Sequence, residues 1–329
     1  MTVLNASHYI EGILQGDVVL LSKAITLTES LNIEHQVLAS KIIDGIIHKT
    51  GQSFRLGITG VPGVGKSSFI EKFGQLLLNK GHRLAVLAVD PTSSRTKGSI
   101  LGDKTRMTEL SARPDVYIRP SPSGGTLGGV TRSTYESMLL CEAAGYDFII
   151  IETVGVGQSE VAVSGFTDFF LLLMLAGAGD ELQGIKRGIM EMADALVITK
   201  ADGDNLEKSK IARSEYAQAL HLFQTTAGGW TPRSLICSSQ SGLGMKEVLE
   251  MIEEYKQAGI QNGNFQSKRK QQQLSLFNTA LEEEIRKQIF RDPMVLKSMR
   301  EIADLSRNNN IQPFAWARKV ADAFLDKLK

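Results

Sequence analysis

Short runs of apolar residues alternate with segments of helical periodicity through the middle of the chain. The runs are rich in Val, Ile, Leu and Phe and too short for helices, which is typical of strands buried on both faces. They are Phe54–Thr59, Leu84–Asp90, Val116–Arg119, Phe148–Glu152, Phe169–Leu175, Ala195–Thr199 and Ser234–Ser238. Because helical patterns separate these runs, the sequence predicts an α/β fold with a mostly parallel, doubly wound sheet and helices on both faces.

Both ends of the chain show the helical pattern without strands. Residues 1–50 carry apolar positions at helical spacing, and the pattern is again purely helical after residue 262. We therefore predict an N-terminal helical extension over 1–50, a central domain over 51–262 and a C-terminal helical arm over 263–329. The polar run Gln261–Gln273 is predicted to be a linker, with Lys268–Lys270 at a solvated helix start rather than in a binding patch.

Composition narrows the class of protein. The 329 residues hold 37 Lys and Arg against 36 Asp and Glu, and 42% are hydrophobic, which argues against a nucleic-acid or membrane-surface binder that works by bulk charge. No basic stretch followed by an apolar core opens the chain, and the apolar run from Phe169 is too short to span a bilayer, so we expect a cytoplasmic protein. Cys141 and Cys237 are expected to be buried, reduced thiols, and the histidines lack metal-ligand spacing.

The stretch GITGVPGVGKSSF joins the first predicted strand to a helix. Gly60, Gly65, Lys66 and Ser67 match G-x-x-x-x-G-K-[ST], in which backbone amides at a helix N-terminus hold phosphates, the lysine meets the outer phosphates and the hydroxyl binds Mg²⁺. A glycine-rich turn with a chance lysine is the weaker alternative, because a strand and a helix flank the motif. We predict a nucleoside triphosphate site formed by Gly60, Gly63, Val64, Gly65, Lys66, Ser67 and Ser68.

Acidic residues stand at the ends of two other predicted strands, where a doubly wound sheet binds its ligands. Glu152 ends the strand in YDFIIIETVGVGQSE and is predicted to hold Mg²⁺ directly or through water. Asp90 ends another strand and Asp103 lies in the loop after it, so both are candidate metal ligands; an Asp-Pro turn and a solvated loop are the alternative. Gly155 and Gly157 are typical of a switch loop that responds to the γ-phosphate.

The run ALVITKADGDN ends a strand close to the Asn-Lys-x-Asp motif that recognises guanine, with Lys200 and Asp202 in place. A guanine edge offers two donors to the Asp202 carboxylate, whereas adenine would leave that carboxylate unpaired. Thr199 replaces the Asn and lacks its amide donor, which predicts weaker affinity with guanine selection kept. Ser238 and Ser239, after the last strand, are weaker candidates for a contact to the base, and an unrelated strand-end Lys and Asp remain the alternative.

These motifs, in this order, resemble the MeaB/MMAA/ArgK family of P-loop GTPases, chaperones of adenosylcobalamin-dependent methylmalonyl-CoA mutase. The stretches that carry the resemblance are GVPGVGKSSF, VDPTSSRTKGSILGDKTRM, RPSPSGGTLGGV, IIIETVGVGQSE and LAGAGDELQGIKRGIMEMAD. The resemblance covers nearly the whole chain and implies a homodimer in which GTP binding and hydrolysis gate cofactor loading and protect or reactivate the mutase. The residues it implies for phosphate and Mg²⁺ are Lys66, Ser67, Asp90, Asp103 and Glu152, and those for guanine are Lys200 and Asp202.

The loop Ala176–Gly188 follows a predicted strand and places glycines beside Lys186 and Arg187. The resemblance implies an additional switch there that faces the mutase, and a surface loop that opens a basic-tipped helix is the alternative. The expected catalytic residues are Lys66, Asp103, Glu152 and Lys186.

The C-terminal segments Leu276–Phe290 and Pro313–Leu328 carry apolar positions at helical spacing. Helices at a chain end are marginal unless they pack on something, so we expect residues from about 264 to 329 to pair two subunits. Folding back onto the central domain of the same chain is the alternative.

Three other functions use the same phosphate loop. A small-molecule or protein kinase would transfer the γ-phosphate to an acceptor, usually from ATP, and the guanine-like motif argues against it. A metal-insertion GTPase generally needs Cys or His clusters that the sequence lacks. A regulatory dimer that holds nucleotide without hydrolysis is the third, and the switch-like glycines and acidic residues favour hydrolysis instead.

Overall fold

The computed structural model describes residues 5–90, 107–122, 127–153, 159–177, 187–220, 229–308 and 311–327. The chain divides into two compact units, Met1–Gln273 and Leu274–Lys329. The boundaries that the sequence suggests at residues 50 and 262 remain predictions, because compactness alone does not define a folding unit.

One sheet forms the centre of the first unit. Among the described residues its strands run in the order β3-β2-β4-β1-β5-β6-β7, and every neighbouring pair is parallel. The strands are β1 Phe54–Gly60, β2 Leu84–Asp90, β3 Val116–Pro122, β4 Phe148–Thr153, β5 Phe169–Met174, β6 Ala195–Ile198 and β7 Arg233–Ile236. The three central strands β4, β1 and β5 are buried along their whole length, as their continuous apolar runs predict. The predicted α/β fold is confirmed, and the sheet is parallel throughout its described part.

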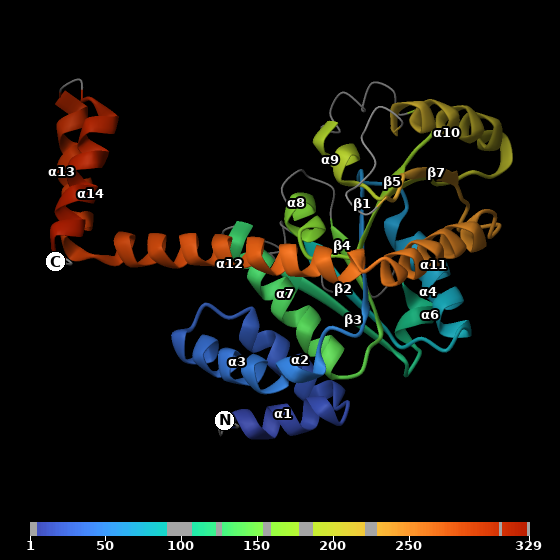
Figure 1. Cartoon of the computed structure of the whole chain (residues 1–329), viewed down its shortest axis with the longest axis horizontal. Helices are drawn as coiled ribbons and strands as arrows, with labels where there is room; N and C mark the ends of the chain where they lie inside the picture. The colour runs from blue at the N-terminus through green and yellow to red at the C-terminus, as the bar shows by residue number, and fades with distance from the viewer. Residues whose placement is uncertain are drawn as a thin grey trace. The chain divides into compact units, whose positions relative to one another are not determined.

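Helices cover both faces of this sheet (Figure 1). Helix α4 packs against α6 and α11 on one face, and α7 packs against α8, which contacts α9, on the other. The helices of this part are α4 Lys66–Asn79, α6 Thr108–Ser111, α7 Leu127–Ala143, α8 Ser159–Ser164, α9 Arg187–Met192, η3 Gly203–Asn205, α10 Leu206–Leu220 and α11 Met245–Gln261. The carboxyl ends of β1, β4 and β6 therefore open between two helical layers, at the edge where the sequence motifs are found.

The N-terminal residues form helices, as predicted, and these pack on α7. They are α1 Ala6–Leu14, α2 Val18–Thr28, α3 Ile33–Ile46 and η1 Ile47–Lys49. Each of the three α-helices begins at an Asn or Asp whose side chain accepts a backbone N–H of the first turn, at Asn5, Asp17 and Asn32. No helix in the described ranges is both long and apolar enough to cross a membrane.

A network of ion pairs, here called the basal cluster, lies at the amino-terminal ends of the strands. Its members are Arg55, Glu142, Asp168, Asp194, Lys268 and Arg269. The guanidinium of Arg269 donates from Nε to Asp168 Oδ1 at 2.7 Å and from Nη2 to Oδ2 at 2.6 Å, which is a bidentate pair. The same guanidinium donates to the carbonyls of Gly51 and Ser53. The first turns of α12 are thereby fixed to the starts of β1 and β5.

Lys268 makes a second set of contacts in the basal cluster. Its Nζ donates to the Asp168 carbonyl at 2.7 Å and to Tyr255 Oη at 3.1 Å, and it pairs with Asp194 Oδ2 at 3.3 Å. Burial would lower the pKa of Lys268, but the negative charge of Asp194 more than offsets this, so that pKa is raised. Lys268 therefore remains a cation that binds two strand starts at once.

The linker prediction for Gln261–Gln273 is wrong. Helix α12 runs without a break over Asn264–Arg291, and Lys268 and Arg269 are paired in the basal cluster rather than solvated. Polar composition suggested a linker because the acidic partners of these cations lie 74 to 101 residues earlier in the sequence.

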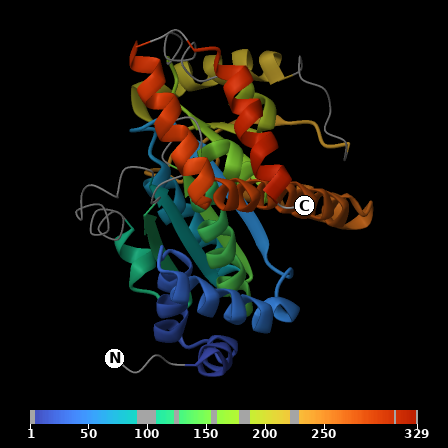
Figure 2. The same ribbon diagram turned by 90° about the vertical axis from the view of Figure 1, so that its left-hand side faces the viewer.

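The second unit contains the rest of α12 and two further helices, α13 Pro293–Asn308 and α14 Pro313–Lys327. Helices α13 and α14 pack side by side as a hairpin (Figure 2). Between these two and the end of α12 is a cavity of about 450 Å³ lined by apolar side chains that include Val295, Trp316 and Phe324. The prediction of a helical C-terminal segment is confirmed over its described residues, 264–308 and 311–327.

Candidate functional site

The phosphate-loop motif lies where predicted, between β1 and α4. The Nζ of Lys66 donates to the carbonyls of Gly60 at 2.7 Å and Val61 at 3.3 Å, so the ammonium lies within the loop. Burial lowers the pKa of Lys66, and the negative charges of Glu152 and Glu160 oppose that shift. A half-buried cation held by loop carbonyls is suited to meet the oxygens of a phosphate chain.

Two glycines of the loop are required by its geometry. Gly60 has φ +151°, and a Cβ there would collide with the backbone oxygen of Leu173 in β5. Gly65 has φ +95° and caps the N-terminus of α4, a left-handed conformation that glycine adopts without strain. The N-terminal amides of α4, beginning at Lys66, Ser67 and Ser68, thus face the same edge as the loop and favour an anion.

Acidic residues lie on β4 and β2, the two strands next in the sheet after β1. Glu152 lies on β4 opposite Ile58 of β1 and is 9% exposed. Asp90 is the last residue of β2, the strand on the other side of β4. Hydroxyl and carboxylate oxygens are the ligands that Mg²⁺ prefers, so Ser67 and Glu152 carry donor groups of a type that suits this ion, and the role of Asp90 remains a prediction. Within the described ranges no three His, Cys, Asp or Glu residues cluster as a self-contained metal site.

Glu160 is a residue of this region that the sequence argument did not assign. It lies in the first turn of α8, is fully buried, and its charge acts on Lys66 together with that of Glu152. The signal was present, since Glu160 ends the same motif as Glu152 in the sequence, but eight residues of separation hid that both lie near one lysine. Glu160 therefore contributes to the electrostatic field at the phosphate loop.

The guanine-like motif comes together at the ends of β6 and β7. The Ser238 hydroxyl donates to the Asp202 carboxylate and accepts the backbone N–H groups of Gln240 and Ser241. The Ala201 amide donates to the Cys237 carbonyl at 3.0 Å, which joins the two strand ends. Ser238 thus orients the acidic residue of the motif, a role different from the base contact considered for it, while Ser239 is half-buried beside it.

Lys200 connects the guanine-like motif to the phosphate loop. It is exposed, has φ +56°, and its carbonyl accepts a hydrogen bond from Asn205 Nδ2 at 2.8 Å. Its Cε lies 3.9 Å from where a Cβ on Gly65 would be. The left-handed backbone, costly for a side chain other than glycine, turns the lysine stem over the loop.

Some predicted residues lie outside the described part of the chain. These are Asp103, Gly155, Gly157 and Lys186; for Asp90 and Arg187 the backbone is described but not the side chain. Their assignment to the metal, to the switch loop and to the partner-facing loop remains a prediction. Cys141 and Cys237 are free and buried, as expected.

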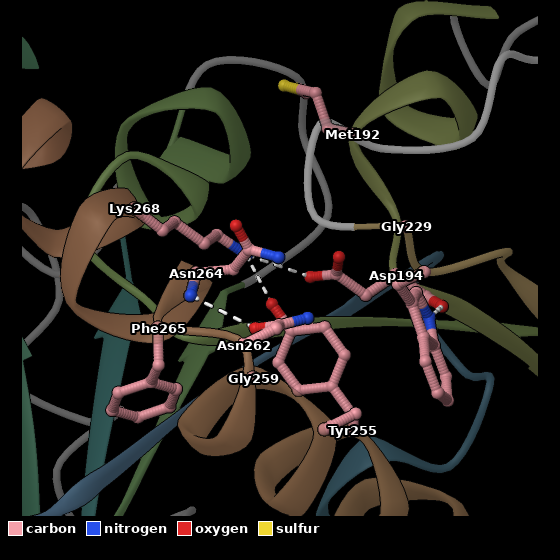
Figure 3. A pocket seen from close by; sticks show the side chains of 11 residues that line it. Met192, Asp194, Gly229, Tyr255, Gly259, Asn262, Asn264, Phe265 and Lys268 are labelled. Atoms are coloured by element: carbon pink, nitrogen blue, oxygen red, sulfur yellow. Dashed lines mark hydrogen bonds and ion pairs between the residues drawn. The ribbon is translucent and has the colours of Figure 1, made fainter.

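A separate cavity of about 380 Å³ lies beside the basal cluster, lined by Asp194, Tyr255, Lys268 and other residues (Figure 3). Asp194 immediately precedes β6, whereas Lys200 and Asp202 follow it. The cavity therefore lies at the opposite end of the strands from the phosphate loop. The motifs, rather than this cavity, mark the candidate site.

This chain is similar to several known proteins. The model of the family described as methylmalonyl Co-A mutase-associated GTPase MeaB matches residues 21–294. The GTPase ArgK of Escherichia coli is 44% identical over 308 residues, which cover 94% of this chain and 93% of that protein. The mouse methylmalonic aciduria type A homolog, mitochondrial, is 47% identical over 271 residues, 79% of this chain and 65% of that protein. A crystal structure of an LAO/AO transport system kinase matches 98% of this chain and 100% of its own with a TM-score of 0.78 and 37% identity.

Proposed function

Because the chain belongs to the MeaB family of GTPases, we propose that its GTP hydrolysis gates the loading of adenosylcobalamin onto methylmalonyl-CoA mutase or a related acyl-CoA mutase. In the same proposal the protein protects or reactivates that mutase in the cytoplasm. The observation that carries the proposal is the meeting of Lys66, Glu152 and the Asp202–Ser238 pair at one edge of the sheet. The family description and the name of the mouse relative support the choice of partner.

The residues of the chain have distinct roles in hydrolysis. The amides from Gly63 to Ser68 hold the phosphates, and Lys66 moves from the Gly60 and Val61 carbonyls to the outer phosphate oxygens. Mg²⁺, when bound, neutralises the charge that develops on the phosphates. Ser67, Asp90, Asp103 and Glu152 supply the oxygen ligands that hold it or its waters. Asp202, oriented by Ser238, accepts the two donors of the guanine edge.

The loop Ala176–Gly188 is proposed to couple this site to the mutase. It follows β5, whose last residue Met174 pairs with Ile198 at the end of β6, so the loop begins at the nucleotide edge of the sheet. An isolated GTPase without an ordered switch is slow, and a charged group delivered on docking raises the rate about 10³-fold or more. Lys186 is our candidate for that group.

A homodimer formed by the second unit is part of the proposal. Exposed apolar side chains follow one another along α12 at helical spacing, at Leu274, Phe277, Leu281 and Ile285. A helix with such a stripe gains stability by covering it with a second helix.

Light scattering tests the dimer. The double variant Phe277→Glu/Leu281→Glu should be a monomer, and Glu282→Lys should keep the wild-type mass. A dimer in the double variant contradicts this arm. Point variants are preferable to truncation near residue 263, which would remove Lys268 and Arg269 from the basal cluster.

Turnover measurements test the function. Purified protein should hydrolyse GTP and not ATP in the presence of Mg²⁺, and an adenosylcobalamin-dependent acyl-CoA mutase should accelerate it. Lys186→Ala should abolish the acceleration while nucleotide affinity remains. Equal use of ATP, or transfer of the phosphate to a protein or small-molecule acceptor, would support a kinase instead. Acceleration of the variant equal to that of the wild type would move the coupling to another surface.

A further inference from the structure

Thr199, the residue that departs from the guanine motif, is turned away from solvent and toward the phosphate loop. It is 3% exposed, and its hydroxyl donates to the Val64 carbonyl at 2.7 Å. The Met174 carbonyl lies at 3.2 Å from the same oxygen but already accepts the Thr199 backbone N–H at 2.9 Å. A hydroxyl has one proton to donate, so the shorter hydrogen bond, to the Val64 carbonyl, is the main one. A side chain so placed has no donor left for a base.

Val64 is the point at which such a bond has most effect on the loop. It stands between Gly63 and Gly65, both at positive φ, and its own side chain is completely buried. Glycine backbone has many accessible conformations, so the loop takes its shape from the few contacts that fix it. Val64 supplies two of them, the apolar side chain below and the carbonyl held by Thr199.

We infer that Thr199 is a positioning residue that fixes the phosphate loop through the Val64 carbonyl and takes no part in reading the base. The inference rests on the proposed function only in taking GDP and GTP as the ligands. Thr199 and Lys200, adjacent in sequence, then contact adjacent residues of the loop, since Thr199 bonds Val64 and the Lys200 stem lies near Gly65. The replacement of Asn by Thr keeps a donor to the loop rather than losing a donor to guanine.

This role separates affinity from selectivity. If the Thr199–Val64 hydrogen bond keeps the loop in the conformation that binds phosphate, its loss lowers the fraction of protein that can bind nucleotide. The apparent Kd rises by the same factor. A neutral buried hydrogen bond corresponds to about a tenfold change in such an equilibrium. The factor applies to GDP and ADP alike, because both carry the same diphosphate. Loss of the Asp202 carboxylate instead changes the ratio of GDP affinity to ADP affinity.

The test compares Thr199→Val, which keeps the shape and removes the hydroxyl, with Thr199→Ser, which keeps the hydroxyl. Thr167→Val is the matched control, because Thr167 is a buried threonine whose hydroxyl donates to a backbone carbonyl at the other end of the sheet. Hydrogen exchange over residues 60–68 is measured in nucleotide-free protein, and GDP and ADP affinities by calorimetry. We expect faster exchange and up to about tenfold weaker GDP binding in Thr199→Val, with the GDP-to-ADP ratio within twofold of wild type. Thr199→Ser and Thr167→Val should leave the loop exchange unchanged.

Unchanged loop exchange in a folded Thr199→Val protein overturns the inference, as does a shift in the GDP-to-ADP ratio like that of Asp202→Ala. If Thr199→Val does not fold, Thr199→Ser decides, because faster loop exchange with the hydroxyl present also overturns it. Failure of the wild-type protein to prefer guanine nucleotides would refute the proposed function alone, since the exchange measurement needs no nucleotide.

Discussion

The two ends of the central sheet handle charge in opposite ways. At the amino-terminal ends, Asp168 and Arg269 are matched in a bidentate pair, and Arg55 pairs with Glu142 at 2.8 Å. At the carboxyl ends, Lys66 donates to two backbone carbonyls of its own loop, with Glu152 and Glu160 acting on it through their charge. At the amino-terminal ends the charged side chains pair with one another, whereas at the carboxyl ends a cation lies within reach of a ligand.

The difference shows which charges build the fold and which serve the ligand. Burial would raise the pKa of Glu142, but the hydrogen bonds and charge of Arg55 lower it, so the carboxylate is stable where it is. Lys66 shows the reverse, because burial lowers its pKa and the nearby acids only oppose that shift. A phosphate chain would add charged partners to Lys66, whereas each of the three carboxylates of the basal cluster is already paired with a cation.

The largest effect is expected in the basal cluster. Arg269→Ala removes the bidentate partner of Asp168, whose side chain is 2% exposed, and leaves a buried carboxylate with less compensation. Breaking one side of a buried ion pair costs about 3–5 kcal/mol of unfolding free energy. Urea unfolding followed by circular dichroism measures it. The exposed neighbour variant Lys270→Ala is the control and should lie within about 0.5 kcal/mol of wild type. A loss below 1 kcal/mol in Arg269→Ala would show that the basal cluster does not hold the helix.

Lys66→Ala should reverse that pattern at the other end of the sheet. The free energy of unfolding should change little, because the lost bonds go to loop carbonyls, while GDP affinity falls roughly 10- to 100-fold with the loss of charge-assisted contacts to phosphate. Calorimetry gives the affinity and urea unfolding the stability. Lys72→Ala, a half-buried lysine on the same helix α4, serves as the control. GDP binding of Lys66→Ala at wild-type strength would remove the lysine from the site.

Base selection should depend on Asp202 alone among the acidic residues of its loop. Asp202→Ala should weaken GDP by about 2 kcal/mol, the scale for unpaired buried hydrogen-bonding groups, and leave ADP unchanged. Asp204→Ala, an exposed acid two residues further on, should bind both as the wild type does. Equal losses for GDP and ADP in Asp202→Ala would mean that the carboxylate supports the loop rather than the base.

The sequence predicts the carboxyl end of the sheet better than it predicts the basal cluster at the amino-terminal ends of the strands. The phosphate loop is local, because its glycines, lysine and serines lie within one short stretch, residues 60–68, and their spacing alone specifies the turn. The basal cluster depends on pairs such as Arg269 with Asp168, 101 residues apart, and a charged run at a helix start gives no sign of such a partner. The same holds for Thr199 and Val64, which are 135 residues apart. Their hydrogen bond assigns the Thr that replaces Asn in the guanine-like motif to the phosphate loop. Side-chain partners between distant elements become visible only once the topology brings the strand ends together.

The smallest effects are expected from two glycines that share a conformation at opposite ends of β1. Gly63 has φ +79° and Gly51 has φ +90°, and a Cβ on either would have no heavy atom within 4 Å. Gly63→Ala and Gly51→Ala should therefore each cost about 1 kcal/mol of unfolding free energy from backbone strain alone. Only Gly63→Ala should also weaken GDP, because its Cβ projects from the loop whose amides hold the phosphates, whereas Gly51 donates to Glu142 in the region of the basal cluster. Urea unfolding and calorimetry on the same two proteins measure both quantities. Equal GDP affinity in the two variants would mean that the space at Gly63 is not used by the nucleotide.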